Sequence, residues 1–211
     1  MSRLREYAVA VGGERCRVWE KGEGKRLGYF PGPGGLPKWT PFLDRLADER
    51  RVIVPSLPGT PGAPAFRHLD SHLDWMIAVQ ELADQAGLTG ADLVGVSVGG
   101  ALAADVAAIW PARVRHLVLI APFGLFDEAE PVADLWAQKP GQLSQILCAD
   151  PAIYDALFAR PEEADEVEWE IVQVRAMEAA GRLLWPVGDT RLVRRLHRVR
   201  EPALLLRRSA N

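Results

Sequence analysis

The chain has 211 residues, of which 48% are hydrophobic and 25% are charged, the make-up of a globular protein with one domain or one domain plus an insertion. Its 25 lysines and arginines face 28 acids, and the net charge of −3 argues against sequence-independent binding of nucleic acid. Two distant cysteines, Cys16 and Cys148, match no metal-ligand spacing, which argues against a zinc site or a disulfide framework.

Targeting signals are missing from the sequence as given. Its N-terminus lacks the apolar core of a secretory signal peptide, and no stretch approaches 18 uninterrupted apolar residues. We therefore expect a cytoplasmic protein without a membrane partner, and we expect neither a metal nor a cofactor.

The first half of the chain alternates strand-like and helix-like segments. Gly12-Gly13 suits the turn of an opening hairpin, Thr40-Pro41 begins a helix, and the Ser71-x-x-Asp74 capping box begins another. The loop 31–35, Pro-Gly-Pro-Gly-Gly, contains too many helix and strand breakers to be either. These signals predict strands at 7–11, 16–20, 27–30 and 52–54, and helices at 41–49 and 71–87.

The second half continues this alternation and is then interrupted. A strand at 92–96, a helix at 98–110 and a strand at 116–121 predict an α/β fold, a mostly parallel sheet with helices on both faces. From 127 to 170 twelve acids face two basic residues and the pattern is helical, which predicts an insertion. Between 182 and 208 eight arginines face two acids around a last strand at 203–206. We expect the acidic and basic blocks to be solvated helix faces that attract each other.

The most specific motif is Gly95-Val96-Ser97-Val98-Gly99-Gly100, which lies where a predicted strand gives way to a helix. It fits the nucleophile elbow G-x-S-x-G, in which glycines two positions on either side of the serine let the strand and helix approach closely. The N–H of Val98, at the helix N-terminus, can donate to the oxyanion that forms when Ser97 attacks a carbonyl. A glycine turn that only packs a helix on the sheet, or a phosphate-binding loop, is the alternative.

On these residues, the sequence resembles the α/β-hydrolase superfamily. The resemblance covers nearly the whole chain, and it implies a hydrolase core over 1–125, a helical cap insertion over 126–182, and a return to the core over 183–211. It is most specific at the elbow. The family continues beyond the strand at 203–206 with further elements, so the resemblance also implies that the last strand and helix of the fold are missing here.

The loop at the end of strand 27–30 departs from the family pattern. The family places His-Gly there, followed by a residue whose N–H completes the oxyanion hole, and the corresponding residues here are Pro31, Gly32 and Pro33. Proline has no N–H to donate. Either Gly34 supplies the donor through a shifted loop, which is the assignment we favour, or the hole lacks one hydrogen bond, a loss of about 10²–10³ in rate.

The residues that should activate Ser97 are not evident. The family places an acid and then a histidine after the nucleophile, whereas His68 and His72 precede Ser97 and His116 begins its strand at the opposite end. These three are expected to be structural. His197 lies in a run of arginines that predicts an exposed helix, and it is a weak candidate for the base.

The triad acid has candidates at two places in the sequence. Asn211 falls at or beside the family's position for it, and the sequence has no counterpart of the histidine there. Some relatives carry the acid after the preceding strand, where Asp127, Glu128 or Glu130 could serve. Three tryptophans in or near the insertion are predicted either to cover an apolar substrate pocket or to pack the cap on the core: Trp136, Trp169 and Trp185.

Two functions remain open from the sequence. The first is a serine hydrolase that acts on a small ester or related carbonyl substrate through an acyl-enzyme at Ser97, with Val98 and Gly34 in the oxyanion hole. The second is a catalytically silent domain on the same fold, or a truncated remnant, which lacks the triad acid and histidine. We expect this 211-residue form to be a poor catalyst and a marginally stable fold with an exposed sheet edge.

Overall fold

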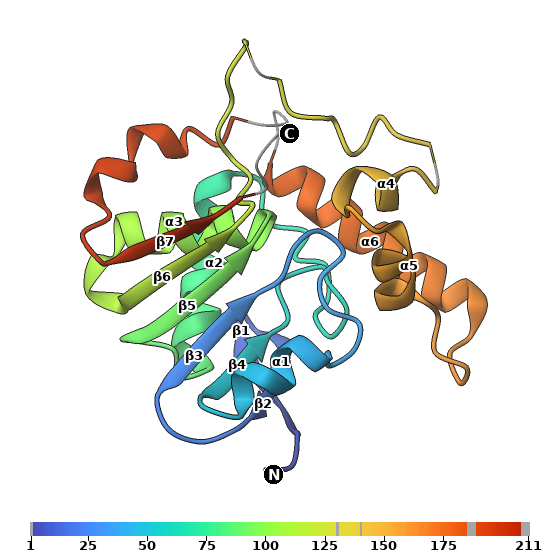
Figure 1. The fold of residues 1–211 in the computed structure, drawn as a ribbon, viewed down its shortest axis with the longest axis horizontal. Helices are drawn as coiled ribbons and strands as arrows, with labels where there is room; N and C mark the ends of the chain where they lie inside the picture. The colour runs from blue at the N-terminus through green and yellow to red at the C-terminus, as the bar shows by residue number, and fades with distance from the viewer. Residues whose placement is uncertain (1, 130, 140, 185–188, 208–211) are drawn as a thin grey trace.

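A computed structural model describes residues 2–129, 131–139, 141–184 and 189–207 of the chain. A seven-stranded sheet in the order β1-β2-β4-β3-β5-β6-β7 carries helices on both faces (Figure 1). The strands are β1 (Arg5–Val11), β2 (Glu14–Lys21), β3 (Arg26–Phe30), β4 (Arg51–Pro55), β5 (Ala91–Val96), β6 (Val114–Ile120) and β7 (Ala203–Leu206). The α-helices are α1 (Pro41–Ala47), α2 (His72–Gln85), α3 (Val98–Ile109), α4 (Leu143–Leu147), α5 (Pro151–Phe158) and α6 (Glu166–Leu183).

Strand pairing confirms the predicted α/β fold class. β2 is antiparallel to β1 and β4, and the remaining neighbours, from β4 through β3, β5 and β6 to β7, are parallel. Phe30 pairs with Gly95, and Gly95 pairs with Leu119 on the next strand. The carboxyl ends of β3, β5 and β6 therefore lie at the same edge of the sheet, which is where ligands bind in open α/β sheets.

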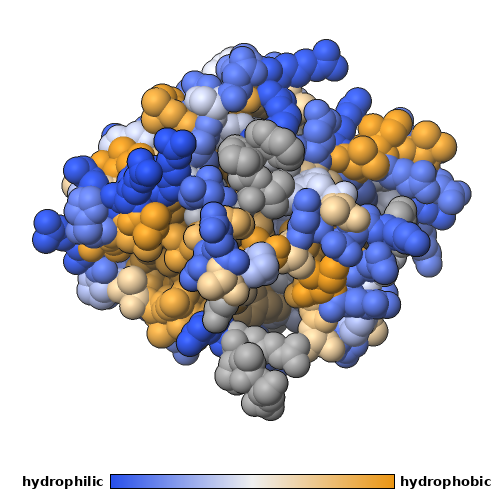
Figure 2. Space-filling model, turned by 90° about the horizontal axis from the view of Figure 1, so that it is seen from above, coloured by the Kyte–Doolittle hydropathy of each residue, from blue (hydrophilic) through white to orange (hydrophobic). Residues whose placement is uncertain are grey.

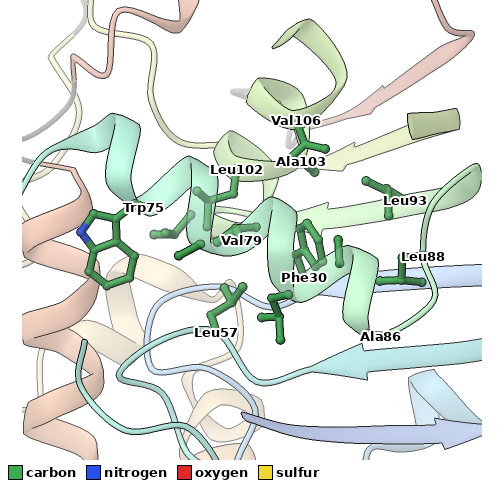
Figure 3. Packing of buried hydrophobic residues seen from close by; sticks show 14 of the residues in the cluster. Phe30, Leu57, Trp75, Val79, Ala86, Leu88, Leu93, Leu102, Ala103 and Val106 are labelled. Atoms are coloured by element: carbon green, nitrogen blue, oxygen red, sulfur yellow. The ribbon is translucent and has the colours of Figure 1, made fainter. Parts of the chain in front are cut away.

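Two hydrophobic clusters cover the two faces of the sheet. Buried side chains of α2 and α3, such as Val79 and Leu102, pack on Phe30 and Leu93 on one face (Figure 3). On the other face Leu43 of α1 joins a smaller cluster with side chains of β3, β4 and β5. Helices on both faces explain why the parallel strands are mostly apolar, with their charged residues near the ends where the strands begin.

The local signals in the sequence produce the expected turns and caps. Gly12 and Gly13 adopt φ of 55° and 86° in the turn between β1 and β2. The Ser71 hydroxyl accepts a hydrogen bond from the Asp74 N–H, and the Asp74 carboxylate accepts one from the Ser71 N–H, which completes the capping box. Cys16 is fully buried, and burial raises the pKa of its thiol to about 11, so it is a core residue with little thiolate character.

β7 is one of the two edge strands of the described sheet, with β1 at the other edge, and all four residues of β7 are exposed. Leu206 lines a groove of about 630 Å³ on the sheet face beside α1, together with Phe42, Val118 and Ile120. An uncharged, apolar edge strand is open to pairing and aggregation. This agrees with the expectation of an exposed sheet edge.

Residues 126–182 carry α4, α5 and α6, which lie beside the sheet edge at which β3, β5 and β6 end (Figure 1). Side chains on one face of α6 are buried, and a Cβ at Gly59 would lie 2.4 Å from the Ala179 Cβ. Figure 2 views the molecule from above and shows hydrophobic patches among hydrophilic surface. Exposed apolar side chains of the insertion include Val132, Ile146, Ile153, Val167, Ile171 and Val174.

The basic segment near the C-terminus does not pair with the acidic insertion, so that expectation is wrong. Arg195 bonds Asp105 of α3, and Arg198 Nε donates to the main-chain oxygen of Ala108. Residues 192–198 form two short 3₁₀ turns against α3 rather than an exposed helix. In the part of the chain that the structure describes, no ion pair joins the two blocks. Among the described helices, none is long and apolar enough to cross a bilayer.

Candidate active site

Ser97 occupies a strained turn between β5 and α3. Its backbone has φ 51° and ψ −115°, a conformation that side-chain-bearing residues rarely adopt. Its N–H donates to Ile120 O (2.9 Å), and its carbonyl oxygen accepts from Ala101 N (3.1 Å) and Phe123 N (3.0 Å). The side chain is half-buried and makes no capping hydrogen bond. The conformation expected of a nucleophile elbow is therefore present.

The glycines of the motif are required by close backbone contacts. A Cβ at Gly95 would lie 2.5 Å from Gly99 O and 2.6 Å from Gly100 Cα. At Gly99, a Cβ would lie 2.3 Å from the main-chain oxygens of both Phe30 and Pro31. The end of β3, the end of β5 and the first turn of α3 thus meet with no room for a side chain.

Substitution of Gly99 by alanine is expected to lower the free energy of unfolding by about 1–3 kcal/mol, since the added methyl group must displace main-chain oxygens. Gly100→Ala is the matched control, because its Cβ would meet Pro122 Cβ at 3.0 Å and Gly95 O at 3.1 Å. Denaturant unfolding of both variants should give a clearly smaller loss for Gly100→Ala. Equal losses would contradict the contact described for Gly99.

The first turn of α3 presents free N–H groups beside Ser97. The first hydrogen bond of the helix runs from Ala101 N to Ser97 O, so the N–H groups of Val98, Gly99 and Gly100 lie at its open end. The helix dipole adds positive potential at the same place. This end of α3 can stabilise a negative oxygen next to the Ser97 hydroxyl.

The loop after β3 passes Ser97 through Gly32. A Cβ at Gly32 would lie 3.5 Å from Ser97 Cβ, whereas a Cβ at Gly34 would lie 2.9 Å from the ring of Phe158 in α5. Within the loop, Gly34 therefore contacts the insertion, whereas Gly32 is the glycine whose Cα faces Ser97. The Lys38 ammonium also donates to Ala156 O, which makes a second contact between this region and α5.

Two histidines are bound to buried carboxylates, as expected of structural residues. His72 Nε2 lies 2.7 Å from Asp105 Oδ2, and its Nδ1 lies 3.3 Å from Leu183 O. Asp105 is fully buried and also accepts a hydrogen bond from Arg195 Nε (2.6 Å). Asp105 lies eight residues after Ser97 on α3, about 12 Å along the helix axis, so His72 is not positioned to act on the serine.

His116 belongs to a charged cluster at the opposite end of the strands. Its Nδ1 lies 2.7 Å from Asp92 Oδ1, and Arg115 donates two hydrogen bonds to the same carboxylate. Burial raises the pKa of Asp92, but the hydrogen bonds from Arg115 and His116 outweigh this effect and leave the pKa below its ordinary value. Asp92 is the second residue of β5, so this cluster lies far from Ser97.

The remaining histidines are also remote from the serine. His68 stacks on Phe66, with ring centroids 5.8 Å apart, next to the hairpin turn at Gly12. His197 is exposed on a 3₁₀ turn beside Arg198, which bonds Ala108 at the last turn of α3. That end of the helix is about 16 Å from Ser97. None of the four histidines is therefore placed as the base.

The candidate acids are not drawn toward Ser97 by any described contact. Asp127 and Glu128 are exposed, and Asp127 Oδ1 accepts a hydrogen bond from Ala129 N (2.9 Å) in a local turn. Glu130 and Asn211 lie outside the described residues. Neither Asp127 nor Glu128 has a feature that favours it as the triad acid.

Of the three tryptophans, Trp136 packs on α6. Its Nε1 donates to Met177 O (2.8 Å), and a Cβ at Gly181 would lie 2.9 Å from that nitrogen. Trp169 is half-buried in α6, and Trp185 lies outside the described residues. The aromatic residue in contact with the loop is Phe158, which the sequence analysis did not single out. An aromatic residue in a short amphipathic helix has no local signal that separates it from ordinary packing.

Comparison with known proteins identifies the family of the chain and a shared fold. A sequence model of the Alpha/beta hydrolase family matches residues 29–210. The chain is 28% identical over 163 residues to a 2-hydroxy-6-oxo-2,4-heptadienoate hydrolase of Pseudomonas putida, covering 74% of this chain and 59% of that protein. It is 37% identical over 155 residues to the dihydrolipoyllysine-residue acetyltransferase component of an acetoin cleaving system, also of Pseudomonas putida, covering 68% of this chain and 41% of that protein.

Among solved structures, naproxen esterase of Bacillus subtilis superposes with a TM-score of 0.68 at 15% identity, covering 97% of this chain and 73% of that one. This likeness concerns the fold alone. The chain spans about three-fifths or less of the length of these two curated relatives.

Proposed function

The chain belongs to the alpha/beta hydrolase family, and on that premise we propose that it is a serine hydrolase with Ser97 as the nucleophile. The observation that carries the proposal is the strained backbone of Ser97 at the junction of β5 and α3, with a side chain that is not used as a helix cap. Strain of this kind persists where the surrounding structure enforces it, commonly at catalytic residues.

The reaction follows from the groups around the serine. The Ser97 oxygen forms a bond to the carbonyl carbon of a small ester or related substrate, and the carbonyl oxygen takes the negative charge. We assign the N–H of Val98, at the open end of α3, to that oxygen. The N–H of Gly34 is assigned with it, because Gly34 lies in the same loop as Gly32, the glycine that approaches Ser97. The bond between the carbonyl carbon and the alcohol oxygen then breaks, and the alcohol leaves with the proton that the Ser97 hydroxyl loses. Water then adds its oxygen to the acyl group, the acid is released, and a proton of that water restores the Ser97 hydroxyl.

Residues 126–182 are proposed as a helical cap that selects the substrate, and residues 183–211 as the return to the core. The contact between Phe158 and Gly34 and the packing of Ala179 against Gly59 support this division. An aromatic ring beside the oxyanion loop favours an apolar acyl group over a sugar or nucleotide. We propose a small molecule, rather than a nucleic acid or a membrane, as the partner.

A catalytically silent domain is the second candidate, and a specific observation favours it. All four histidines are held away from Ser97, two of them by hydrogen bonds to Asp92 and Asp105. A serine without a base keeps only the residual rate that binding and the oxyanion hole provide. We therefore expect slow ester turnover by this chain even if Ser97 is reactive.

Covalent labelling separates the two candidates. A fluorophosphonate should add its mass to the peptide that contains Ser97, because the reagent needs an oriented serine and an oxyanion hole but no release of an acyl group. Intact-protein mass spectrometry measures the extent, and a well-characterised serine esterase run in parallel checks the reagent. Absence of any adduct under conditions that label the esterase completely would favour the silent domain.

A further inference from the structure

Arg17 joins the loop that passes Ser97 to the irregular loop after β4. It lies in β2 at the edge where β4 ends, and its Nη2 donates to Leu36 O (3.1 Å) and to Pro61 O (2.8 Å). Leu36 ends the loop that passes Ser97, and Pro61 belongs to the irregular loop after β4. The main chain of Arg17 bonds the second loop as well, through Gly62 O and Ser56 N, both at 2.8 Å.

The loop that passes Ser97 is packed against its neighbours but has few other hydrogen bonds among the described residues. Gly34 and Gly35 adopt φ of 83° and 70°, and one internal hydrogen bond runs from Gly35 N to Gly32 O (3.1 Å). Glycines lose more backbone freedom on ordering than other residues, so such a loop needs external contacts to stay in place. It packs on the second loop, where a Cβ at Gly35 would lie 2.5 Å from Thr60 Cβ.

Holding Arg17 in this position is unfavourable by itself. Burial lowers the pKa of its guanidinium, an effect that Glu6 partly offsets, and its Nε is buried without a hydrogen-bond partner among the described residues. Room for Nε exists because residue 62 is glycine, with φ of 93°, and a Cβ there would lie 2.6 Å away. The ring of Trp19, 3.7 Å from Cζ, offsets part of the cost of burying the guanidinium through a cation–π contact. Apolar side chains fill such space at lower cost than a cation does, so packing alone does not account for an arginine here.

We propose that Arg17 is a positioning residue for the loop 31–36, and through it for the Gly34 N–H in the oxyanion hole. This inference rests on the function proposed above. A guanidinium suits the role because its planar donors hold two carbonyl oxygens in fixed directions. Misplacing a reacting group by about 1 Å can lower a rate by about 10²-fold.

Hydrogen exchange tests the positional part without any need for activity. Arg17→Met keeps an unbranched apolar chain and removes the donors, and amide exchange of segments 32–36 and 57–63 should accelerate by about tenfold or more. Arg15→Met is the matched control, since Arg15 is exposed on the same face of β2 and should leave these segments unchanged. Arg17→Lys, which keeps the charge, should restore part of the protection and replaces the methionine variant if that variant does not fold.

Labelling kinetics test the functional part. Arg17→Met should lower the rate of fluorophosphonate labelling about 10–100-fold with the lysine variant in between, and any ester turnover should fall in kcat more than it changes in KM. Unchanged loop exchange in both Arg17 variants would overturn the inference, as would faster exchange with an unchanged labelling rate. If the wild-type chain is never labelled, the proposed function fails, and the exchange result alone then decides whether Arg17 holds the loop.

Discussion

Replacing Ser97 by alanine is expected to abolish covalent labelling by a fluorophosphonate and to reduce any ester turnover to the level of the buffer blank. The other groups at the site would stay in place, because the Ser97 side chain makes no capping hydrogen bond and its backbone bonds to Ile120, Ala101 and Phe123 do not depend on the hydroxyl. Ser56→Ala is the matched control, since Ser56 is a buried serine that also directly follows a strand of the sheet. Labelling that persists in Ser97→Ala would place the reactive residue elsewhere.

Stability gives a second measurement on the same residue. Ser97→Gly should raise the free energy of unfolding by about 1 kcal/mol, because glycine adopts a positive φ without the strain that a Cβ imposes, whereas Ser97→Ala should change it little. A variant that is more stable than the wild type would show that the serine is held in this conformation at a cost in stability. Loss of stability in Ser97→Gly would argue that the turn is not strained.

The parts of this fold that sequence patterns predict are those that depend on neighbours in the chain. The turn at Gly12-Gly13, the capping box at Ser71 and the strained turn at Ser97 each arise within a few residues, and the structure has all three. The sequence predicts that the glycines on either side of Ser97 let the main chain of neighbouring elements approach closely. The contacts at Gly95 and Gly99 leave no room for a Cβ, as that prediction requires.

Other features depend on contacts between distant segments and could not be read in this way. The arginines after residue 182 were expected on a solvated helix, yet Arg195 reaches Asp105, ninety residues earlier in the chain. Asp105 itself carried a signal that went unused, because it is the single charged residue in the apolar helix 98–109. A lone acid surrounded by buried alanines and valines requires a buried cationic partner.

Because Asp105 is buried and paired, we expect Asp105→Ala to lower the free energy of unfolding by about 3–5 kcal/mol. The carboxylate is fully buried and faces Arg195 at 2.6 Å and His72 at 2.7 Å. Its removal leaves both partners without their acceptor inside the protein. Denaturant unfolding at neutral pH measures the loss.

Asp70→Ala is the matched control, because Asp70 also pairs with an arginine, Arg182, but its side chain is 87% exposed at a distance of 3.8 Å. Exposed pairs of this kind contribute little, so the control should unfold nearly as the wild type does. A loss in Asp105→Ala as small as that in Asp70→Ala would show that the buried pairs contribute little to stability.

Removing the partners together should have the opposite outcome to removing the acid alone. With Asp105→Leu, His72→Leu and Arg195→Met combined, no charge is left without a partner, and apolar side chains fill the space, so much of the stability lost in Asp105→Ala should return. The triple variant should also leave labelling of Ser97 intact, because the charged cluster lies about two turns along α3 from the serine. The triple variant could instead be as unstable as Asp105→Ala. That result would show that the charged groups add net stability to the packing of residues 189–198 on α3 and do more than neutralise one another.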